Sequence, residues 1–349
     1  MIDVYDNEND NLNPDSYLEE TKKWINTEFN IADFNDVRLN KRLMDIIVSF
    51  CSSPNTSIPQ KYNSWAKIKA TYRFLNNKKV SHKNILNPHQ IATQKRISEQ
   101  QIVLAIQDTS ILNYTSHPET KGLGNIGSDE SIKGMLVHTT LSMTPSRVPL
   151  GIIHQQTWIR PYEEYGKKHR RYEKSIQEKE SQKWLNSLQA TEQLKKDCPD
   201  TLIINIGDRE ADIYELFQQA NDINVQSKLL VRAFHNRNVD AQEQYLWSYM
   251  KIQPLACTLE VSVPRKKKKA ERIAYVELRF CNVTIKPPKS KSNLFPITLN
   301  AIYLIEPSPP LDEEPLSWML LTTLSLNSVS DAVQSVEYYA QRFLNRIIP

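Results

Sequence analysis

Two aspartates follow short hydrophobic runs in this sequence, and their type and position suit metal-dependent chemistry. Asp108 ends the run QIVLAIQD, and Asp208 ends the run TLIINIGD. In α/β proteins, side chains at the carboxyl ends of buried strands face the crevice in which ligands bind. A pair of carboxylates that converge there offers the oxygen ligands that Mg²⁺ prefers. The alternative is that each aspartate only caps the turn or helix that follows it.

Other catalytic patterns are missing or out of context. The run from Lys121 to Gly127 contains a literal GxGxxG, yet no strand leads directly into it and no helical period follows, so we interpret it as a flexible loop near the active crevice. The histidines form no HExxH motif, which leaves zinc chemistry unsupported, and no GxSxG elbow occurs. The four cysteines include no CxxC pair, which excludes a disulfide scaffold and is typical of a cytosolic protein.

The charge of the chain is distributed unevenly, although its net value is only +4. Residues 1–20 hold seven acidic side chains and no Lys or Arg, whereas residues 36–79 hold nine Lys or Arg against two Asp. A second basic cluster covers residues 265–269. Clustered cations favour a polyanionic partner, and the alternative is solvated helix faces and a charged hairpin tip. No apolar run approaches the roughly 20 residues that cross a bilayer, and the acidic N-terminus does not resemble a signal peptide.

The elements that must position these residues begin with a helical region. Residues 1–18 are polar, acidic and rich in Asn, which predicts a disordered tail. Residues 19–90 predict a small helical domain, in which Asn35 or Asp36 can cap one helix and a second helix covers about 64–75. Apolar and basic positions are mixed on the second helix.

Residues 91–349 predict an α/β core with a mixed sheet, because short β-rich runs alternate with helical segments. The expected strands cover 101–109, 136–143, 150–158, 201–208 and 228–234, and the expected helices about 172–194, 211–220 and 330–346. Between about 240 and 316 the sequence shows the alternation typical of strands, at 256–263, 272–285 and 297–305, and no helical period. We interpret that segment as an antiparallel β insertion.

Several motifs resemble the bacterial cut-and-paste transposases of the IS-four family, the Tn-five-like group. The resemblance extends from about Phe34 to the end of the chain. Its most specific parts are a DREAD block after a hydrophobic strand and a WMLLTT block about twenty residues before YYAQR. The motifs that carry it are DVRLNKRL, YRFLNN, IQDTS, MLVHTTL, WIRP, EKESQKWL, GDREADIYEL, LVRAFHNR, EPLSWMLLTT and VEYYAQR.

The resemblance implies an RNase H-like core in which three carboxylates hold two Mg²⁺ or Mn²⁺ ions. Asp108 and Asp208 match the first two ligands, and we expect their carboxylates within about 8 Å of each other. The implied chemistry is cleavage, hairpin formation and strand transfer at transposon ends in double-stranded DNA, by a homodimer. Trp318 resembles a tryptophan that stacks on a flipped base, and its alternative is an ordinary core residue. The residues expected to contact DNA are Arg38, Lys41, Arg42, Lys67, Lys69, Arg73, Arg232, His235, Arg237, Trp318, Tyr339 and Arg342.

The final helix departs from the family signature of Tyr, two residues, Arg, three residues, Glu, six residues and Lys. Tyr339 and Arg342 fit, but Arg346 stands where the family has its third acidic ligand. The signature lysine would fall beyond Pro349, and the family's C-terminal pairing region is absent, so we expect a truncated copy that does not turn over. The alternative function is a non-catalytic, inhibitory protein that binds transposon ends. Both functions, transposase and non-catalytic DNA binder, predict a cytoplasmic protein that associates with the chromosomal DNA of a prokaryote. Neither predicts an association with a membrane.

Overall fold

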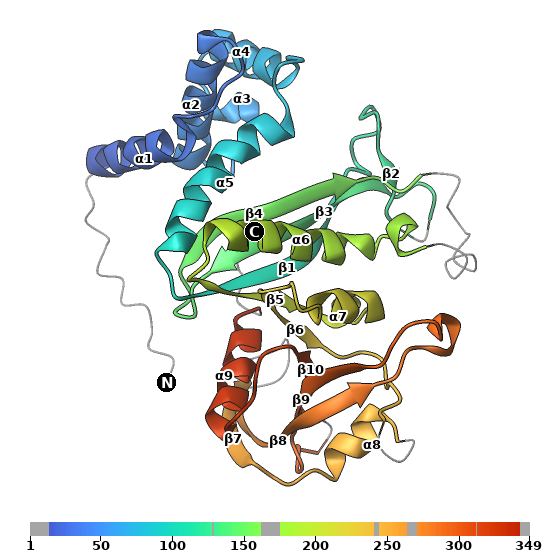
Figure 1. The fold of residues 1–349 in the computed structure, drawn as a ribbon. Helices are drawn as coiled ribbons and strands as arrows, with labels where there is room; N and C mark the ends of the chain where they lie inside the picture. Colours follow the sequence, from blue (N-terminus) through green and yellow to red (C-terminus); the bar gives the residue numbers. More distant parts are fainter. Residues whose placement is uncertain are drawn as a thin grey trace. The chain divides into compact units, whose positions relative to one another are not determined.

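In the computed structural model, the chain forms two compact units, residues 1–95 and 96–349. The first unit is helical, and the second is a mixed α/β unit (Figure 1). The structure describes residues 14–127, 129–161, 175–240, 244–263, 271–311 and 313–342. The basic cluster at 265–269 and Arg346 lie outside the described residues. In the described part of the chain, no helix is both long and apolar enough to cross a bilayer.

The N-terminal unit is helical, as expected, and its helices pack around a small apolar core. That core contains Phe34, Leu43, Ile46 and Phe74, with the two phenylalanine rings edge to face at 5.6 Å. The two helices expected from the sequence are present as α2 and α4, and the Asp36 carboxylate accepts a hydrogen bond from the backbone N–H of Arg38 at the start of α2. The helices are α1 (Pro14–Phe29), α2 (Val37–Ser52), α3 (Ile58–Lys61), α4 (Trp65–Leu75) and α5 (His82–Ser98).

Two expectations for this unit differ from the structure. Helix α1 begins at Pro14, so the last residues of the predicted disordered tail at 1–18 are helical. Proline is tolerated in the first turn of a helix, and the burial of Ile25 at 1% exposure anchors α1 further along. Helix α5 continues to Ser98, beyond the expected boundary at residue 90, because its C-terminal Ile97 is buried among strand residues.

The second unit is built on one mixed sheet of ten strands, in the order β2-β3-β1-β5-β6-β10-β9-β8-β7, with β4 also paired to β3. The pairs β1–β5 and β5–β6 are parallel, and the other pairs are antiparallel. The strands are β1 (Ile102–Asn113), β2 (Gly124–Asn125), β3 (Lys133–Met143), β4 (Pro149–Trp158), β5 (Leu202–Gly207), β6 (Lys228–Arg232), β7 (Cys257–Val263), β8 (Arg272–Ile285), β9 (Ile297–Ile305) and β10 (Ser317–Thr322).

Helices cover the sheet on both faces, because side chains alternate along the buried strands. On β6, Leu229 and Val231 pack with α6 (Gln182–Asp197), α7 (Tyr214–Ala220) and α8 (Leu246–Lys251), whereas Leu230 packs with α9 (Val329–Ala340). Figure 1 shows α9, in red, as the helix that follows the last strand. The sheet therefore has a core on each side, which explains why its central strands are continuous hydrophobic runs.

The expected strands are confirmed, but three details of the second unit are different. The strands of the predicted antiparallel β insertion are present, and they extend the central sheet because β10 joins β9 to β6. Helix α8 lies within the segment that was expected to lack helices. Helix α6 begins at Gln182 rather than near 172, and the residues at 162–174 lie outside the described part. The presumed loop at 121–127 includes β2, in which Gly124 pairs with Gly134 of β3. Neither position has room for a Cβ, because the backbones of Arg160 and Leu112 approach Gly124 and Gly134, respectively.

Candidate functional site

The parallel pairing of β1 and β5 brings Asp108 and Asp208 to neighbouring positions. Ile106 pairs with Ile206, so the two aspartates, each two residues further along, lie at the same end of the sheet. Asp108 is still within β1, opposite Thr139 of β3, and its side chain is more than half exposed. Asp208 directly follows β5, where its carboxylate accepts a hydrogen bond from the backbone N–H of Glu210 at 2.9 Å. Asp208 is therefore both a cap of the short turn at Arg209–Ala211 and a member of the carboxylate pair.

Arg342 joins the two carboxylates. One of its guanidinium nitrogens, Nη2, lies 2.7 Å from Oδ1 of Asp108 and 3.2 Å from Oδ2 of Asp208. The two oxygens can be no farther apart than the sum of these distances, which confirms the expected proximity. The Arg342 side chain is only 8% exposed, and its Nε is a buried donor without a hydrogen-bond partner. A buried positive charge thus neutralises the pair from the side of α9.

Further arginines surround the same carboxylates. Arg232, at the end of β6, donates from Nη2 to the carbonyl of Ser317 at 2.9 Å, and its pKa is lowered first by burial and then by the nearby charges of Arg209 and Arg342. Tyr339 of α9 is hydrogen-bonded with Arg232, and burial raises the pKa of its hydroxyl. Arg209, Arg232 and Arg342 together exceed the two carboxylates by one positive charge. This end of the sheet therefore favours the binding of an additional negative charge.

A buried network of polar side chains lies behind Asp108. Gln107 and Thr109 flank Asp108 in β1 and therefore point to the opposite face of the sheet. Gln107 Nε2 donates to Oδ1 of Asn205 in β5 at 3.1 Å, and His138 of β3 contacts both Gln107 Oε1, at 3.4 Å, and Thr109 Oγ1, at 2.9 Å. Because the Gln107 oxygen only accepts, His138 donates from Nε2 and accepts at Nδ1 from the Thr109 hydroxyl. The network connects β1 to its two neighbours, β3 and β5, next to the position of Asp108 in β1.

His138 stays neutral in this network. Burial, followed by the charge of Lys183, lowers the pKa of its imidazole to about 3 from an ordinary value of 6.5. Its ring is fully buried and lies edge to face against Trp184 of α6, with centroids 4.6 Å apart. A neutral imidazole can keep one donor and one acceptor in place across the physiological pH range, which suits a structural position.

We expect acid to destabilise the chain through His138. In the unfolded chain the imidazole takes up a proton near pH 6.5, whereas in the folded chain it does so only near its pKa of about 3. Stability from this group is therefore lost as pH falls, by roughly 1.5 kcal/mol between pH 6.5 and 5. Urea unfolding at a series of pH values measures it. His138→Gln should show a flatter pH dependence, and His117→Gln, an exposed control, should match the wild type. Equal slopes in all three would contradict the assignment.

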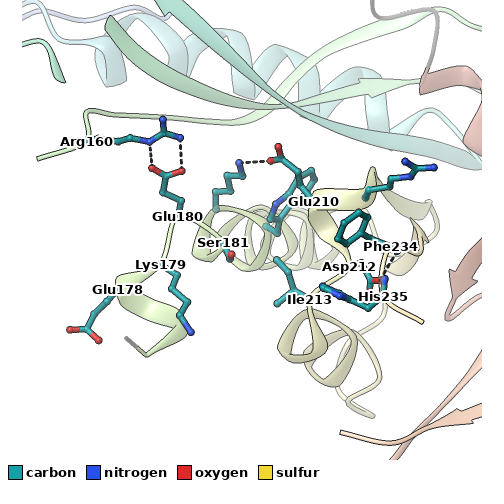
Figure 2. A pocket seen from close by; sticks show the side chains of 13 residues that line it. Arg160, Glu178, Lys179, Glu180, Ser181, Glu210, Asp212, Ile213, Phe234 and His235 are labelled. Atoms are coloured by element: carbon teal, nitrogen blue, oxygen red, sulfur yellow. Dashed lines mark hydrogen bonds and ion pairs between the residues drawn. The ribbon is translucent and has the colours of Figure 1, made fainter. Parts of the chain in front are cut away.

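A pocket of about 550 Å³ is lined in part by Arg209 and Glu210, the two residues that follow Asp208 in sequence (Figure 2). Its acidic side chains are largely engaged: Glu180 accepts from Arg160, and Glu210 accepts from Lys183 at 3.1 Å. Lys183 itself is buried, with its ammonium 5.6 Å from each of two tryptophan rings. The lining holds as many Asp and Glu as Lys and Arg, so its charge alone does not select an anionic ligand. These residues are Arg160, Glu178, Lys179, Glu180, Ser181, Lys183, Trp184, Arg209, Glu210, Asp212, Ile213, Phe234 and His235.

The loop after β6 is held by a buried carboxylate. Asp212 accepts hydrogen bonds from the backbone N–H groups of Phe234 and His235, each at 2.7 Å, and from the guanidinium of Arg237. Asp212 and Arg237 are both buried, so Arg237, expected to contact DNA, instead fixes the loop. His235 is exposed at the pocket rim, beside the exposed ring of Phe234 (Figure 2). A sequence pattern does not distinguish a buried arginine from a solvated one at the end of a strand.

Trp318 lies in β10 and is partly buried. Its ring packs edge to face against Tyr339, with centroids 5.3 Å apart and an angle of 72°. This packing agrees better with Trp318 as a core residue than with an exposed ring. Trp318 nevertheless lies at the end of the sheet that carries Asp108 and Asp208. Arg342 contacts Asp108 and Asp208, and Tyr339 and Arg232 lie nearby, while their expected contacts with DNA stay a prediction. His138, Gln107 and Lys183 were missed. Gln107 and Thr109 are detectable in principle, since polar residues that flank a strand-end aspartate share the face opposite to it.

The basic residues expected to contact DNA in the N-terminal unit are mostly exposed. Arg38 forms an ion pair with Asp36 at 3.2 Å, and Arg42 lies 3.6 Å from Asp45. Both are exposed pairs, which contribute little to stability. The remaining cations of this set, all with exposed side chains, are Lys41, Lys67, Lys69 and Arg73.

The described residues contain no group of three or more His, Cys, Asp or Glu side chains placed to hold a metal ion. Glu210, a possible third acid, is held by Lys183, and Glu337 is exposed on α9. The two carboxylates thus form a pair without a third acidic partner in this part of the chain.

Comparison with known proteins identifies the N-terminal unit. Residues 21–80 match the family model described as transposase DNA-binding, and this match supports a transposase that binds DNA. The fold also has a distant likeness to a chain in the cryo-EM structure of the piggyBac transposase synaptic complex with hairpin DNA. That likeness has 10% sequence identity and a TM-score of 0.35, and it covers 96% of this chain but 59% of the other. A similarity this low does not establish a shared fold or function.

Proposed function

We propose that this protein is a cut-and-paste DNA transposase of the DDE type, with an RNase H-like core that carries the chemistry. The observation that carries the proposal is the placement of Asp108 and Asp208 at neighbouring ends of two parallel strands, with both carboxylates on one guanidinium nitrogen. In α/β sheets this end of parallel strands is where ligands bind. The transposase DNA-binding match of residues 21–80 supplies the substrate class. The motifs quoted above support the IS-four family, and with it a prokaryotic origin.

The carboxylate pair fits Mg²⁺ or Mn²⁺. Mg²⁺ is usually held by one or two protein carboxylates together with water and substrate phosphates, and Asp108 and Asp208 supply that donor set. Arg342 contacts both carboxylates, so a divalent ion would compete with its guanidinium for the pair. A divalent ion bound there would supply an activated water and stabilise the attacking and leaving oxygens of an in-line displacement at phosphorus.

The surrounding residues bind and orient the DNA in this proposal. Arg232 neutralises a phosphate next to the carboxylates, and Tyr339 positions Arg232 through their hydrogen bond. Trp318 offers its ring to an unpaired base at the same end of the sheet, which recovers part of the cost of unstacking. The helical N-terminal unit holds the transposon end, and the homodimer in which the resembled family acts stays a prediction for this chain.

The activity of this chain is a separate part of the proposal. Arg346 stands where the resembled family has its third acidic ligand, and a cation cannot hold a second metal ion there. We expect cleavage of transposon ends to be slower than in a family member with an acidic residue at this position by roughly a thousandfold or more, since a lost metal ligand costs several kcal/mol of transition-state stabilisation. The second candidate function, a non-catalytic DNA binder, is favoured by the engagement of both aspartates with Arg342.

A cleavage assay tests this proposal. Duplexes that carry candidate end sequences are incubated with Mg²⁺ or Mn²⁺ and either the chain or Arg346→Glu. We expect binding without efficient nicking by the chain and a measurable gain for Arg346→Glu that disappears in Arg346→Glu with Asp208→Asn. Efficient nicking or hairpin formation by the unmodified chain would mean that another residue supplies the third ligand. A failure to bind any duplex would overturn the transposase proposal itself.

Binding to DNA should depend steeply on salt. The cations of the N-terminal unit neutralise several phosphates, so affinity is expected to fall at least about tenfold between 50 and 200 mM salt. Fluorescence anisotropy with a labelled duplex measures the slope. The triple change Lys41→Gln, Lys67→Gln and Lys69→Gln should flatten it. Lys121→Gln, Lys133→Gln and Lys251→Gln, three exposed lysines of the other unit, form the matched control with a smaller effect. A salt response that is flat for the wild type would contradict phosphate binding.

A further inference from the structure

Lys183, at the start of α6, is buried although its side chain carries a charge. It belongs to the EKESQKWL block, to which the sequence alone assigns no chemistry. Its ammonium lies 5.6 Å from the ring centroids of Trp158 and Trp184 and donates to Oε2 of Glu210 at 3.1 Å. Figure 2 shows this ion pair as the dashed line that ends on Glu210. Lys183 therefore reaches from α6 to the short turn that directly follows Asp208.

The ion pair of Lys183 with Glu210 is a poor stabiliser of the fold. The Lys183 side chain is 8% exposed, whereas that of Glu210 is 67% exposed. Burial of an ammonium group costs free energy, and a carboxylate that stays in water offsets little of this cost. An apolar side chain of similar length between the two tryptophan rings would avoid the cost and would leave Glu210 in water. Stability alone therefore does not explain a lysine at this position.

Glu210 connects Lys183 to Asp208 through its own backbone. The two carboxylate oxygens of Asp208 have different partners: Oδ1 accepts from the N–H of Glu210 at 2.9 Å, and Oδ2 lies 3.2 Å from Nη2 of Arg342. The turn thus decides which oxygen of Asp208 faces the carboxylate pair. A side chain that holds Glu210 in place also holds the N–H that orients Asp208.

The start of α6 also packs tightly against the end of β5. Gly207 is the last residue of β5, and a Cβ there would lie 2.5 Å from Cβ of Ala211 and 3.3 Å from Cζ3 of Trp184. The tryptophan ring therefore leaves the turn no space on that side. The buried side of the turn is fixed by this packing, and its exposed side, at Glu210, is fixed by the ion pair with Lys183.

We propose that Lys183 is a positioning residue for the metal site: through Glu210, it holds the Asp208 carboxylate in the orientation that binds a divalent cation. This inference rests on the proposed function, because it takes Asp108 and Asp208 as the ligands of Mg²⁺ or Mn²⁺. Groups that orient the ligands of a metal contribute to its affinity without touching it. The sign of the effect is diagnostic. Removal of a nearby cation by itself raises the affinity for a divalent ion, whereas the loss of a positioning residue lowers it.

The test is the affinity of the full chain for Mn²⁺ alone, measured by electron paramagnetic resonance. It is carried out in the wild type and again in Arg342→Gln, in which no guanidinium competes for the carboxylates. In both, Lys183→Met should weaken Mn²⁺ binding about 10- to 100-fold, the usual loss when an outer partner of a metal ligand is removed. Lys196→Met removes an exposed lysine further along α6 and is the matched control, with the affinity unchanged. An unchanged or higher affinity in Lys183→Met would contradict the inference.

A loss of orientation is distinguished from a loss of stability by a second variant of α6. Leu188 is fully buried, so Leu188→Ala should lower the melting temperature and yet leave the affinity for Mn²⁺ unchanged at temperatures where the chain is folded. Lys183→Met should do the reverse, with a melting temperature close to that of the wild type and a lower affinity. If both variants weaken Mn²⁺ binding in proportion to the stability that they lose, Lys183 is a structural residue and the inference is wrong.

Glu210 allows a test at an exposed position, where a substitution leaves the core intact. Glu210→Ala and Glu210→Gln remove the same charge, but only glutamine keeps an oxygen that accepts a hydrogen bond from Lys183. Glu210→Ala should therefore bind Mn²⁺ about tenfold more weakly than Glu210→Gln. Equal affinities of these two variants would overturn the inference while the metal site stands. If Asp208→Asn does not abolish Mn²⁺ binding in the Arg342→Gln chain, the proposed metal site itself is wrong, and the inference fails with it.

Discussion

Arg342→Gln is expected to raise the affinity of the carboxylate pair for Mn²⁺ by roughly a hundredfold, equivalent to about 3 kcal/mol. In the present structure one guanidinium nitrogen contacts both Asp108 and Asp208, at 2.7 and 3.2 Å. A divalent cation must either displace the Arg342 guanidinium or share the Asp108 and Asp208 carboxylates with it. Glutamine keeps a polar, shorter side chain and removes the competing charge, so the two carboxylates are left with a net negative charge that favours the ion.

Electron paramagnetic resonance of Mn²⁺ measures the bound fraction, and thermal unfolding gives an independent measurement. The melting temperature of Arg342→Gln should rise on addition of Mn²⁺, because an ion that binds only the folded chain stabilises it. Arg209→Gln is the matched control: it removes an exposed charge beside Asp208 and should raise the affinity only slightly. In the double variant Arg342→Gln with Asp208→Asn, the gain should disappear. A gain that survives the loss of Asp208 would place the metal elsewhere.

Asp212→Ala is expected to destabilise the second unit by about 3–5 kcal/mol, the usual cost of removing one partner of a buried ion pair. The Asp212 side chain is fully buried and that of Arg237 is 6% exposed. Alanine leaves the Arg237 charge without its carboxylate and also removes the acceptor of two backbone N–H groups, those of Phe234 and His235. Urea unfolding followed by circular dichroism measures the change in the free energy of unfolding.

Two further variants distinguish the ion pair from a general effect of losing an aspartate. Asp222→Ala removes an exposed aspartate of a surface turn and should cost less than about 1 kcal/mol. Combining Asp212→Leu with Arg237→Met removes both charges and should recover part of the loss, since a buried pair is often replaceable by apolar residues. If the double variant is as unstable as Asp212→Ala, the two backbone hydrogen bonds rather than the charge of Arg237 carry the stability of the loop.

The location of the candidate site could be predicted from the sequence because it depends on local patterns. Hydrophobic runs of strand length end at Asp108 and Asp208, and the strand period at 256–263, 272–285 and 297–305 is also local. When two such runs form parallel neighbouring strands, their carboxyl ends lie at the same edge of the sheet, whichever helices cover the sheet. The Asp36 cap of α2 is another local feature, since a carboxylate and the N–H two residues later need no other part of the chain.

Other features depend on contacts between residues far apart in sequence, and only the tertiary structure decided them. Whether β7 to β9 form a separate insertion or extend the central sheet depends on β10, which pairs with β6 on one side and β9 on the other. The contact of Arg342 with both aspartates joins residues more than 130 positions apart, so no local period records it.

The exposure of Trp65 and Tyr72 is likewise a tertiary result. A helical period gives the relative direction of side chains, but burial is set by which side the rest of the unit covers, and here Phe34 covers the side of Phe74. The neutral state of His138 has the same origin, because the strands and the helix that enclose its ring remove it from water. The amino-acid sequence by itself therefore determined the hydrophobic strand segments that lead to Asp108 and Asp208, while tertiary packing determined which side chains are charged, paired or left to bind a partner.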